Sequence, residues 1–353
     1  MAIADAGHGR RSHAALLRYI ARRLIIACLL VVGLTLVTFS LTNLVPGDPV
    51  AAALGQRAAD DPAIVARFRA EYGLDQSLPQ QYLSYLNRLL HGDLGTSWQT
   101  HHPVAEDLAR AIPATMEIAL CAIVASALIG LTFGVWSAYK RGRATDQVLR
   151  LVSLIGISVP TFWMAILCFS TFYYRLGIFP GSGRLSPGLA APPHRTGLFT
   201  LDALLAGDFR TFVDAASHLA MPVMVLTLYT VGLLTRFSRS SILEVLETDY
   251  VRAAKAKGLS GWTVFRKYVL RAAAIPILTI IGLAFGSLLS GTVLVESIFS
   301  WPGLGTYAYQ SASKLDLLGV MGVGLFVGLV YLTINLVVDL MYGLIDPRVR
   351  VGR

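Results

Sequence analysis

Six apolar runs, each of a length that suits a membrane-crossing helix, constrain this chain more than any other feature of its sequence. They cover residues 24–45, 112–138, 151–174, 219–235, 275–299 and 318–344. A helix needs about 20 apolar residues to cross a hydrocarbon core of roughly 30 Å. The charged residues make up only 14% of the chain, against roughly 25% in a soluble domain. The sequence therefore predicts an all-α, polytopic membrane protein with six transmembrane helices.

The positions of the basic residues predict the orientation of these helices. Twenty of the 30 Lys and Arg residues fall on the side of the membrane that would hold both termini, and ten fall on the other side. Cytoplasmic loops keep Lys and Arg, so we expect both termini to be cytoplasmic. The net charge of +9 then follows from the many basic residues of the cytoplasmic segments. We therefore expect membrane lipid, and not nucleic acid, as a partner.

The N-terminal part is expected to stay attached to the mature protein. Residues 24–45 are too long for the apolar core of a signal peptide and end in VPGDP, so they are interpreted as the first transmembrane helix. Residues 1–23 would be a cytoplasmic segment, of which residues 14–23 resemble a short interfacial helix. The three cysteines, at positions 28, 121 and 168, all fall in apolar runs and predict neither a disulfide nor a metal site.

Two outer connections differ in character. Residues 46–111 contain helix-like stretches separated by Gly and Pro signals, which predicts a small folded cap. Residues 175–215 are rich in Pro and Gly and are expected to form an irregular outer loop. The remaining spans would form a helical core within residues 112–353.

Small residues follow one face of the fifth run. Gly282, Gly286 and Ser290 recur every four residues, and Ser287 with Gly291 forms a neighbouring row. Small residues let membrane helices approach closely, so helix packing is the favoured interpretation. The alternative is that this face lines a translocation path.

Ionisable residues inside apolar runs are candidates for function. Glu117, Glu296 and Asp339 each lie within about two helical turns of a predicted membrane face, where capping or pairing with an Arg is favoured over substrate contact. Glu117, Glu296 and Trp301 are retained as candidate gate or interface residues. His218 is expected to begin the fourth helix at the outer face.

The cytoplasmic segment 236–271 is too long and too helical to be a simple connection. Asp249 can cap a short helix that begins at Tyr250, while Lys255 and Lys257 suit its C-terminal end and Gly258 suits a left-handed stop. Its alanine-rich surface would contact a protein partner, and its basic flank would steer that partner. A second helix, residues 261–270, is capped by a serine and is expected to lie at the membrane surface.

The residues of this segment match a known family. DYVRAAKAKGLS (249–260) resembles the coupling segment of permeases in ATP-binding-cassette importers, with Arg252 where the general pattern has Glu. Further matches occur in order along the chain: VPGDP (45–49), YGLDQSLPQQY (72–82), HGDLGTS (91–97), PATMEIAL (113–120), SVPTFW (158–163), LVESIFSWPGLG (294–305) and NLVVDLMYGLIDPRVR (335–350). The chain is similar to the dipeptide, oligopeptide and nickel branch, and its SGRLS at 182–186 is most like dipeptide permeases. The resemblance covers nearly the whole chain.

This resemblance implies the fold of a type I importer permease in the bacterial cytoplasmic (inner) membrane. The implied partners are a second homologous permease subunit, two ATP-binding subunits and an extracytoplasmic substrate-binding protein. The docking residues would be those of the coupling helix: Asp249, Tyr250, Arg252, Ala253, Ala254, Lys255, Lys257 and Gly258. The implied function is import of dipeptides or oligopeptides, with nickel or another small solute as the alternative.

No cofactor is expected on this chain. None of its five lysines completes a GxxxxGK[ST] phosphate loop, so ATP and Mg would be bound by the partner subunits and this chain would not be an enzyme. An intramembrane hydrolase is disfavoured because Ser158 and His218 are expected near opposite faces. An ion-coupled secondary transporter would need broken helices and charges near the midplane, which the sequence does not indicate.

Overall fold

The computed structural model describes residues 5–44, 55, 60–72 and 75–345. Its helices are α1 (Asp5–Leu44), α4 (Pro62–Tyr72), α5 (Leu78–Leu90), α6 (Val104–Tyr139), α7 (Ala144–Ser158), α8 (Thr161–Cys168), α9 (Phe199–Leu205), α10 (Phe209–Leu246), α11 (Asp249–Ala256), α12 (Gly261–Val264), α13 (Leu270–Gly291), α14 (Val293–Ile298), α15 (Leu304–Ser313) and α16 (Leu317–Ile345). Two segments are π-helical. η1 (Phe169–Arg175) continues α8, and η2 (Phe265–Val269) joins α12 to α13. The described residues contain no strand, so the predicted all-α class is confirmed.

Five helices of the described chain are long and apolar enough to cross a membrane, and a bent pair of helices makes a sixth when it is counted as one span. That pair consists of residues 144–158 and 161–175, which meet at an angle of 96°. Pro160 causes the break, because the residue before a proline is disfavoured in helical geometry and Val159 is extended, with ψ of 125°. The prediction of unbroken spans was therefore wrong at the third crossing, and the predicted total of six spans is reached when the bent pair is counted as one.

Several helix ends lie outside the apolar runs that predicted them. α6 begins at Val104, inside the predicted cap, and α10 begins at Phe209, ten residues before the predicted start. α1 is continuous from Asp5, so residues 14–23 are not a separate interfacial helix. An apolar run marks the part of a helix that fits the hydrocarbon, whereas backbone hydrogen bonding continues until a cap or a breaker stops it. Asp208 is such a cap, since its side chain accepts a hydrogen bond from the Thr211 N–H.

The fifth span also differs from the prediction at both ends. Residues 261–291 form one uninterrupted helical stretch through α12, η2 and α13, so the predicted helix at the membrane surface is the start of this span. α13 ends at Gly291, well before the predicted end, and the chain continues as α14 after Thr292.

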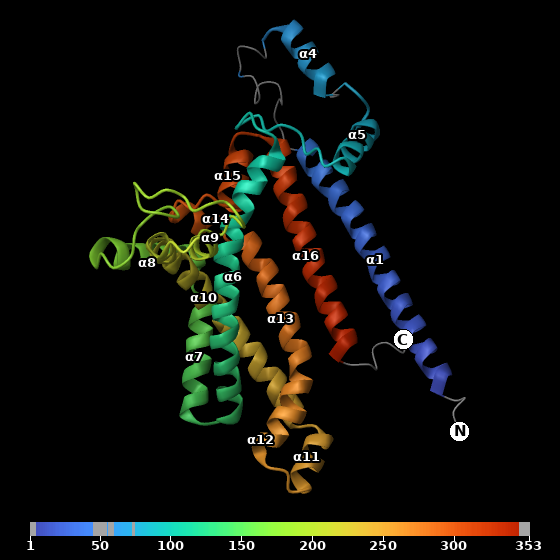
Figure 1. Ribbon diagram of the computed structural model, residues 1–353, viewed down its shortest axis with the longest axis vertical. Coiled ribbons are helices and arrows are strands. Elements are labelled where there is room, and N and C mark those ends of the chain that lie inside the picture. Colours follow the sequence, from blue (N-terminus) through green and yellow to red (C-terminus); the bar gives the residue numbers. More distant parts are fainter. Residues whose placement is uncertain (1–4, 45–54, 56–59, 73–74, 346–353) are drawn as a thin grey trace.

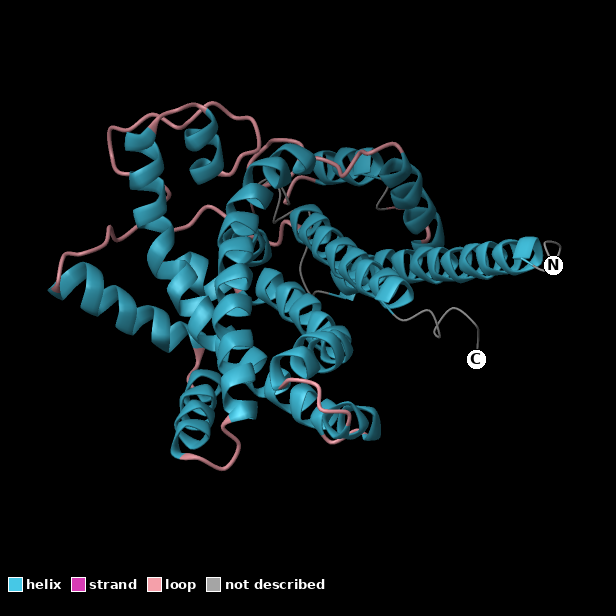
Figure 2. Cartoon of the chain, turned by 60° about the horizontal axis from the view of Figure 1, so that its bottom comes forward, coloured by secondary structure: helices cyan, strands magenta, loops and turns pink. Residues whose placement is uncertain are grey.

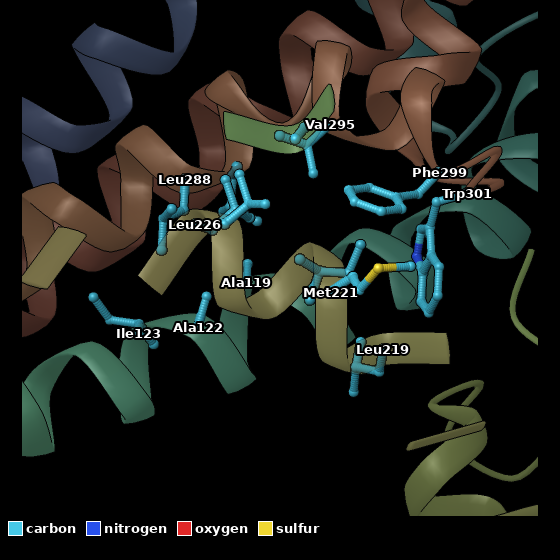
Figure 3. Packing of buried hydrophobic residues seen from close by; sticks show 14 of the residues in the cluster. Ala119, Ala122, Ile123, Leu219, Met221, Leu226, Leu288, Val295, Phe299 and Trp301 are labelled. Atoms are coloured by element: carbon cyan, nitrogen blue, oxygen red, sulfur yellow. The ribbon is translucent and has the colours of Figure 1, made fainter. Parts of the chain in front are cut away.

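The helices α6, α10 and α13 lie side by side at the centre of the molecule, with α7 next to α6 and α10 (Figure 1). α6 and α10 approach closely because Gly130 and Gly134 face Leu234 and Ser238, where an added Cβ would lie within 2.7 Å of a neighbour. The main apolar core fills the space between these helices, and Trp301 and Phe299 close one end of it (Figure 3).

α1 lies apart from this core and packs on α16 and α5 (Figures 1 and 2). Gly324 of α16 lies against Thr38, and Gly328 lies against Leu34. An ion pair of 2.5 Å between Arg23 and Asp339 ties the same two helices at their other end. The favoured pairing of Asp339 with an Arg is thus present in the structure.

The predicted cap is partly packed and partly exposed. α5 packs on α1 through Tyr82, whose hydroxyl lies 3.0 Å from the Thr35 hydroxyl and whose ring lies 5.4 Å from that of Phe39. Ser97 donates a 2.5 Å hydrogen bond to Asp316 just before α16. α4 extends away from the bundle (Figure 1), so the cap is anchored through α5 and the segment after it.

Candidate functional site

The helices α11 and α12 form one end of the molecule and project beyond the long helices (Figure 1). Val251 is fully buried and Ala254 is 4% exposed, and both pack in a cluster with Ile242 of α10, Val264 of α12 and Val269. This cluster holds α11 on the bundle. The remaining face of α11 is free to contact another protein.

The exposed side chains of α11 combine positive charge with apolar surface. Arg252, Ala253, Lys255 and Lys257 are all exposed. Next to them lie exposed Tyr250, Leu259 and Trp262, of which Trp262 is 68% exposed. Ala254 was predicted to contact a partner and is instead part of the cluster that anchors the helix, because it follows Val251 by three residues on the same face.

The two ends of α11 are formed differently from each other. Thr248 is the N-cap residue, one position earlier than predicted, and its hydroxyl donates to the Val245 carbonyl. Asp249 is therefore the first residue of the helix and not its cap, and it pairs with Arg252 at 3.0 Å. A carboxylate in the first turn still interacts favourably with the helix dipole.

The predicted left-handed stop is present. Gly258 has φ of 75°, and the N–H of Leu259 reaches the Ala254 carbonyl at 3.4 Å while the Gly258 N–H donates to Lys255. Space around the Gly258 Cβ position is open. Ser260 then caps α12 by accepting a hydrogen bond from the Thr263 N–H, as predicted.

The small residues of α13 separate into two groups. Gly282 and Gly286 face α16, where an added Cβ would lie 2.9 Å from Val338 and 2.6 Å from Tyr331. These two glycines are packing positions. Ser287 and Gly291 instead line a cavity of about 380 Å³, and Ser290 is exposed beside it.

That cavity lies at the break in the third span. Its wall includes the residues from Ile157 to Phe162, together with Tyr229 and Thr230 of α10 and the two small residues of α13. Ser158 was considered as a hydrolase nucleophile and lines this cavity, whereas His218 is buried within α10 with its Nδ1 2.9 Å from the Asp214 carbonyl. His218 thus does not begin its helix, contrary to the prediction.

Glu117 is buried and paired with Arg184 from the outer loop at 2.6 Å. The same carboxylate accepts hydrogen bonds of 2.7 Å from the N–H and the hydroxyl of Thr200. The Arg184 guanidinium also lies 3.5 Å from the centre of the Phe199 ring. The outer loop predicted as irregular therefore contains α9 and is fixed to α6.

Glu296 is fully buried without a basic partner in the described structure. It accepts hydrogen bonds from the hydroxyls of Thr115 and Thr292, at 2.6 and 3.0 Å, and from the Thr306 N–H at 2.9 Å. Burying a carboxyl group is costly unless it is hydrogen-bonded in this way. Glu296 thereby joins α6, α14 and the start of α15.

Trp301 is 1% exposed and donates from its indole N–H to the Ala114 carbonyl at 2.9 Å. Its ring points into the main core beside Phe299 and Met221 (Figure 3). Glu117, Glu296 and Trp301 all contact or adjoin the outer part of α6, so the structure brings these three predicted residues into one region.

Sequence reasoning missed the partners of these residues. Arg184 lies in the SGRLS motif and Thr115 in the PATMEIAL motif. Both motifs were identified by their resemblance to the permease family, which does not indicate the contacts of their side chains. Sequence reasoning also missed Asp146, a buried carboxylate of α7 that accepts two hydrogen bonds from Arg239 of α10, at 2.8 and 2.9 Å. Across the described residues, no group of three or more His, Cys, Asp or Glu is placed to hold a metal ion.

Comparison with known proteins gives two family matches. The binding-protein-dependent transport system inner membrane component matches residues 130–351, and the N-terminal part of such membrane components matches residues 16–119. Together these matches cover the proposed coupling segment, the cavity and all of the predicted cap, residues 46–111.

Several characterised sequences are similar along nearly their whole length. The probable D,D-dipeptide transport system permease protein DdpB of Escherichia coli (strain K12) is 44% identical, with 92% of this chain and 95% of that protein covered. The di/tripeptide transport system permease protein DppB of Pseudomonas aeruginosa (strain UCBPP-PA14) is 42% identical, with 95% and 99% covered. Among solved structures, the MetNI methionine ABC transporter in an inward facing conformation is 15% identical, covers 68% of this chain and 96% of its own, and has a TM-score of 0.49.

Proposed function

This chain belongs to the family of inner membrane components of binding-protein-dependent transport systems, and from that membership we propose that it is the permease subunit of an ATP-driven importer of dipeptides and oligopeptides. The proposal for peptides rests on the relatives, which transport D,D-dipeptides and di- and tripeptides according to their names. Their similarity covers at least nine-tenths of both chains, including the outer segments that would meet a delivered solute.

The observation that carries the mechanism is the geometry of α11. A short helix is held at one end of the bundle by two buried residues, Val251 and Ala254, while its basic face is left exposed. Such a helix can transmit a push from a docked protein to α10, on which it packs, and through α12 and η2 to α13, because α11 also packs on α12 and these last three segments form one helical stretch. We propose that two ATP-binding subunits dock here and on an equivalent helix of a second, homologous permease.

The proposed translocation path runs past the cavity at the third span. Ser287 and Gly291 face it, and the break at Pro160 exposes backbone groups in its wall. Non-helical backbone at membrane depth is tolerated where it is buried in protein or lines a water-filled cavity. The path would be completed by the second permease, and an extracytoplasmic substrate-binding protein would deliver the peptide at the end that carries α5 and α15.

Both termini are proposed to be cytoplasmic. The bias of basic residues supports this orientation, and α1 begins toward the end of the molecule that carries α11 (Figure 1). The ATP-binding subunits and the N-terminus would then share one side of the membrane.

Uptake assays test the proposed cargo. A strain that lacks this gene should lose uptake of labelled dipeptide or of a longer peptide and regain it on complementation, while nickel uptake should stay unchanged. Loss of nickel uptake with normal peptide uptake would show that the chain imports nickel and not peptides. Normal uptake of all three solutes would contradict the proposal.

A further inference from the structure

A groove of about 690 Å³ lies between α7 and α10. Figure 1 shows that α7 and the adjoining part of α10 extend toward the end of the molecule that carries α11. Gln147, Arg150 and Ser153 of α7 form one wall, and Thr235, Arg236 and Arg239 of α10 form the other. We call it the α7–α10 groove. The permease mechanism proposed above makes no use of it.

The groove carries uncompensated positive charge. Arg239 is already engaged with Asp146. Arg150 and Arg236 are exposed, and within the described part of the chain neither forms an ion pair. No Asp or Glu lines the groove, so an anion there would meet two free guanidinium groups.

A buried side chain in the wall of the groove also carries a hydroxyl without a partner. Thr235 is 2% exposed, and its Oγ1 has no hydrogen-bond partner in the described structure. Leaving such a group buried and unpaired has a free-energy cost. An acceptor oxygen bound between the two arginines would remove that cost, so Thr235 is a second and independent indication of a ligand.

The groove wall also has an apolar stretch along α7. Leu151 and Leu154, 60% and 57% exposed, continue from Arg150 along α7 toward Ile157, at the break in the span. A ligand that fits both parts has an anionic head and an apolar tail. Arginines bind phosphate oxygens through paired hydrogen bonds, and basic pockets between transmembrane helices near the membrane surface suit phospholipid headgroups.

We propose that the α7–α10 groove binds an anionic phospholipid. Arg150 and Arg236 contact its phosphate, Thr235 donates a hydrogen bond to a phosphate oxygen, and an acyl chain lies along Leu151 and Leu154. The bound lipid would link α7 to α10 beside the Asp146–Arg239 ion pair and so brace the half of the third span that lies before its break. This inference rests on the membrane location of the chain and not on the nature of its cargo.

The test is a titration of the purified full-length chain in a nonionic detergent with phosphatidylglycerol, followed by native mass spectrometry. Replacement of both arginines, Arg150→Gln with Arg236→Gln, should weaken phosphatidylglycerol binding by about 30-fold, at about 1 kcal/mol for each basic residue. Thr235→Val keeps the side-chain volume and should weaken binding by about 3- to 10-fold, as expected for one hydrogen bond. The matched control is Arg143→Gln with Arg266→Gln, which removes two exposed charges from the same end but outside the groove.

The proposal holds if wild-type protein prefers phosphatidylglycerol to phosphatidylcholine and only the groove variants lose that preference. Equal loss in the control pair would show nonspecific surface attraction and overturn it. Competition by inorganic phosphate as strong as that by the lipid would show a small-anion site and also overturn it. Efficient disulfide cross-linking of Leu154→Cys to a second permease in cell membranes would show that the groove is a subunit interface, which contradicts lipid occupancy. None of these outcomes depends on peptide uptake, so the inference can fail while the proposed function stands.

Discussion

The guanidinium group of Arg184 lies 2.6 Å from the carboxylate of Glu117, and both side chains are nearly excluded from solvent. The two residues are separated by 67 positions in the sequence. Their contact fastens the outer loop to the outer part of α6, beside Trp301. Loss of either partner leaves the other charge buried and uncompensated.

We therefore expect Arg184→Met to lower the free energy of unfolding by about 3–5 kcal/mol. Glu117→Gln should have an effect of similar size, since its removal leaves the guanidinium unpaired. The double variant should be less destabilised than the sum of the two. Thermal unfolding of the purified protein in detergent measures all three, and purely additive effects would contradict an energetic coupling of this pair.

The proposed coupling helix, α11, offers a sharper test of function. Gly258 has φ of 75° and open space around it, so Gly258→Leu imposes backbone strain of roughly 1–2 kcal/mol and adds bulk on the proposed docking surface. Peptide uptake should fall strongly while the protein still inserts, and the ATP-binding subunits should dissociate or hydrolyse ATP without transport.

The matched control for this variant is Gly142→Leu. Gly142 has φ of 78° and is also surrounded by open space, but it lies in the turn between α6 and α7. It carries the same strain without touching α11. Equal losses of uptake in both variants would attribute the effect to strain, and normal uptake by Gly258→Leu would exclude α11 as the coupling site.

If the cavity at the third span is part of the translocation path, a large side chain that fills it should block transport. Gly291 faces this cavity and has no atom within 4 Å of its Cβ position. Gly291→Phe should fill the cavity without disturbing the fold and should abolish most peptide uptake. Ser290→Phe adds a similar ring at the neighbouring exposed position, outside the cavity wall, and should be tolerated. Uptake and unfolding temperature should be measured together, and normal transport by Gly291→Phe would place the path elsewhere.

The outer loop should loosen in acid. Burial alone would raise the pKa of the Asp202 carboxyl, but hydrogen bonds from Thr196 and from the N–H groups of Gly197 and Arg195 outweigh it and hold the pKa below its usual value. A carboxyl with a lowered pKa stabilises the folded state above its unfolded pKa of about 3.9, and this contribution is lost as the pH falls through the folded pKa.

Hydrogen exchange can follow this change directly. Protection of the Thr196 and Gly197 amides, corrected for intrinsic exchange, should be constant above about pH 5 and should decline below about pH 4. Asp202→Asn should show reduced protection already at neutral pH. Asp208→Asn is the control, because Asp208 caps α10 at Thr211 and makes no contact with the loop amides.

Membrane orientation can be tested with single cysteines in a background free of the three native ones. Ala191 of the outer loop and Lys257 at the end of α11 are both exposed. A cysteine at position 191 should react with an impermeant thiol reagent in intact cells, and one at position 257 should react only after the membrane is opened. The reverse pattern would invert the proposed topology.

The sequence predicted the features that depend on local chemistry. The number of spans follows from apolar length, and the ends of α11 and α12 at Gly258 and Ser260 follow from backbone geometry and capping. It could not predict contacts such as Glu117 with Arg184, because nothing in the two local sequences indicates which loop folds back onto which helix. The sequence also treated the small residues of α13 as one face. In the structure Gly286 packs against Tyr331 of α16, whereas Gly291 lines the cavity at the third span.

The broken third span has a consequence for how the protein enters the membrane. Its halves contain 15 residues in α7 and 15 in residues 161–175, so each is about 22 Å long and too short to span the hydrocarbon alone. α7 lies so close to α10 that a Cβ at Gly232 would be 2.5 Å from the Ser153 carbonyl, and α10 is synthesised later. α7 also packs on α6, but its close contact with α10 can form only after α10 has been synthesised. We therefore expect the third crossing to reach its final position in the membrane only after α10 has been inserted.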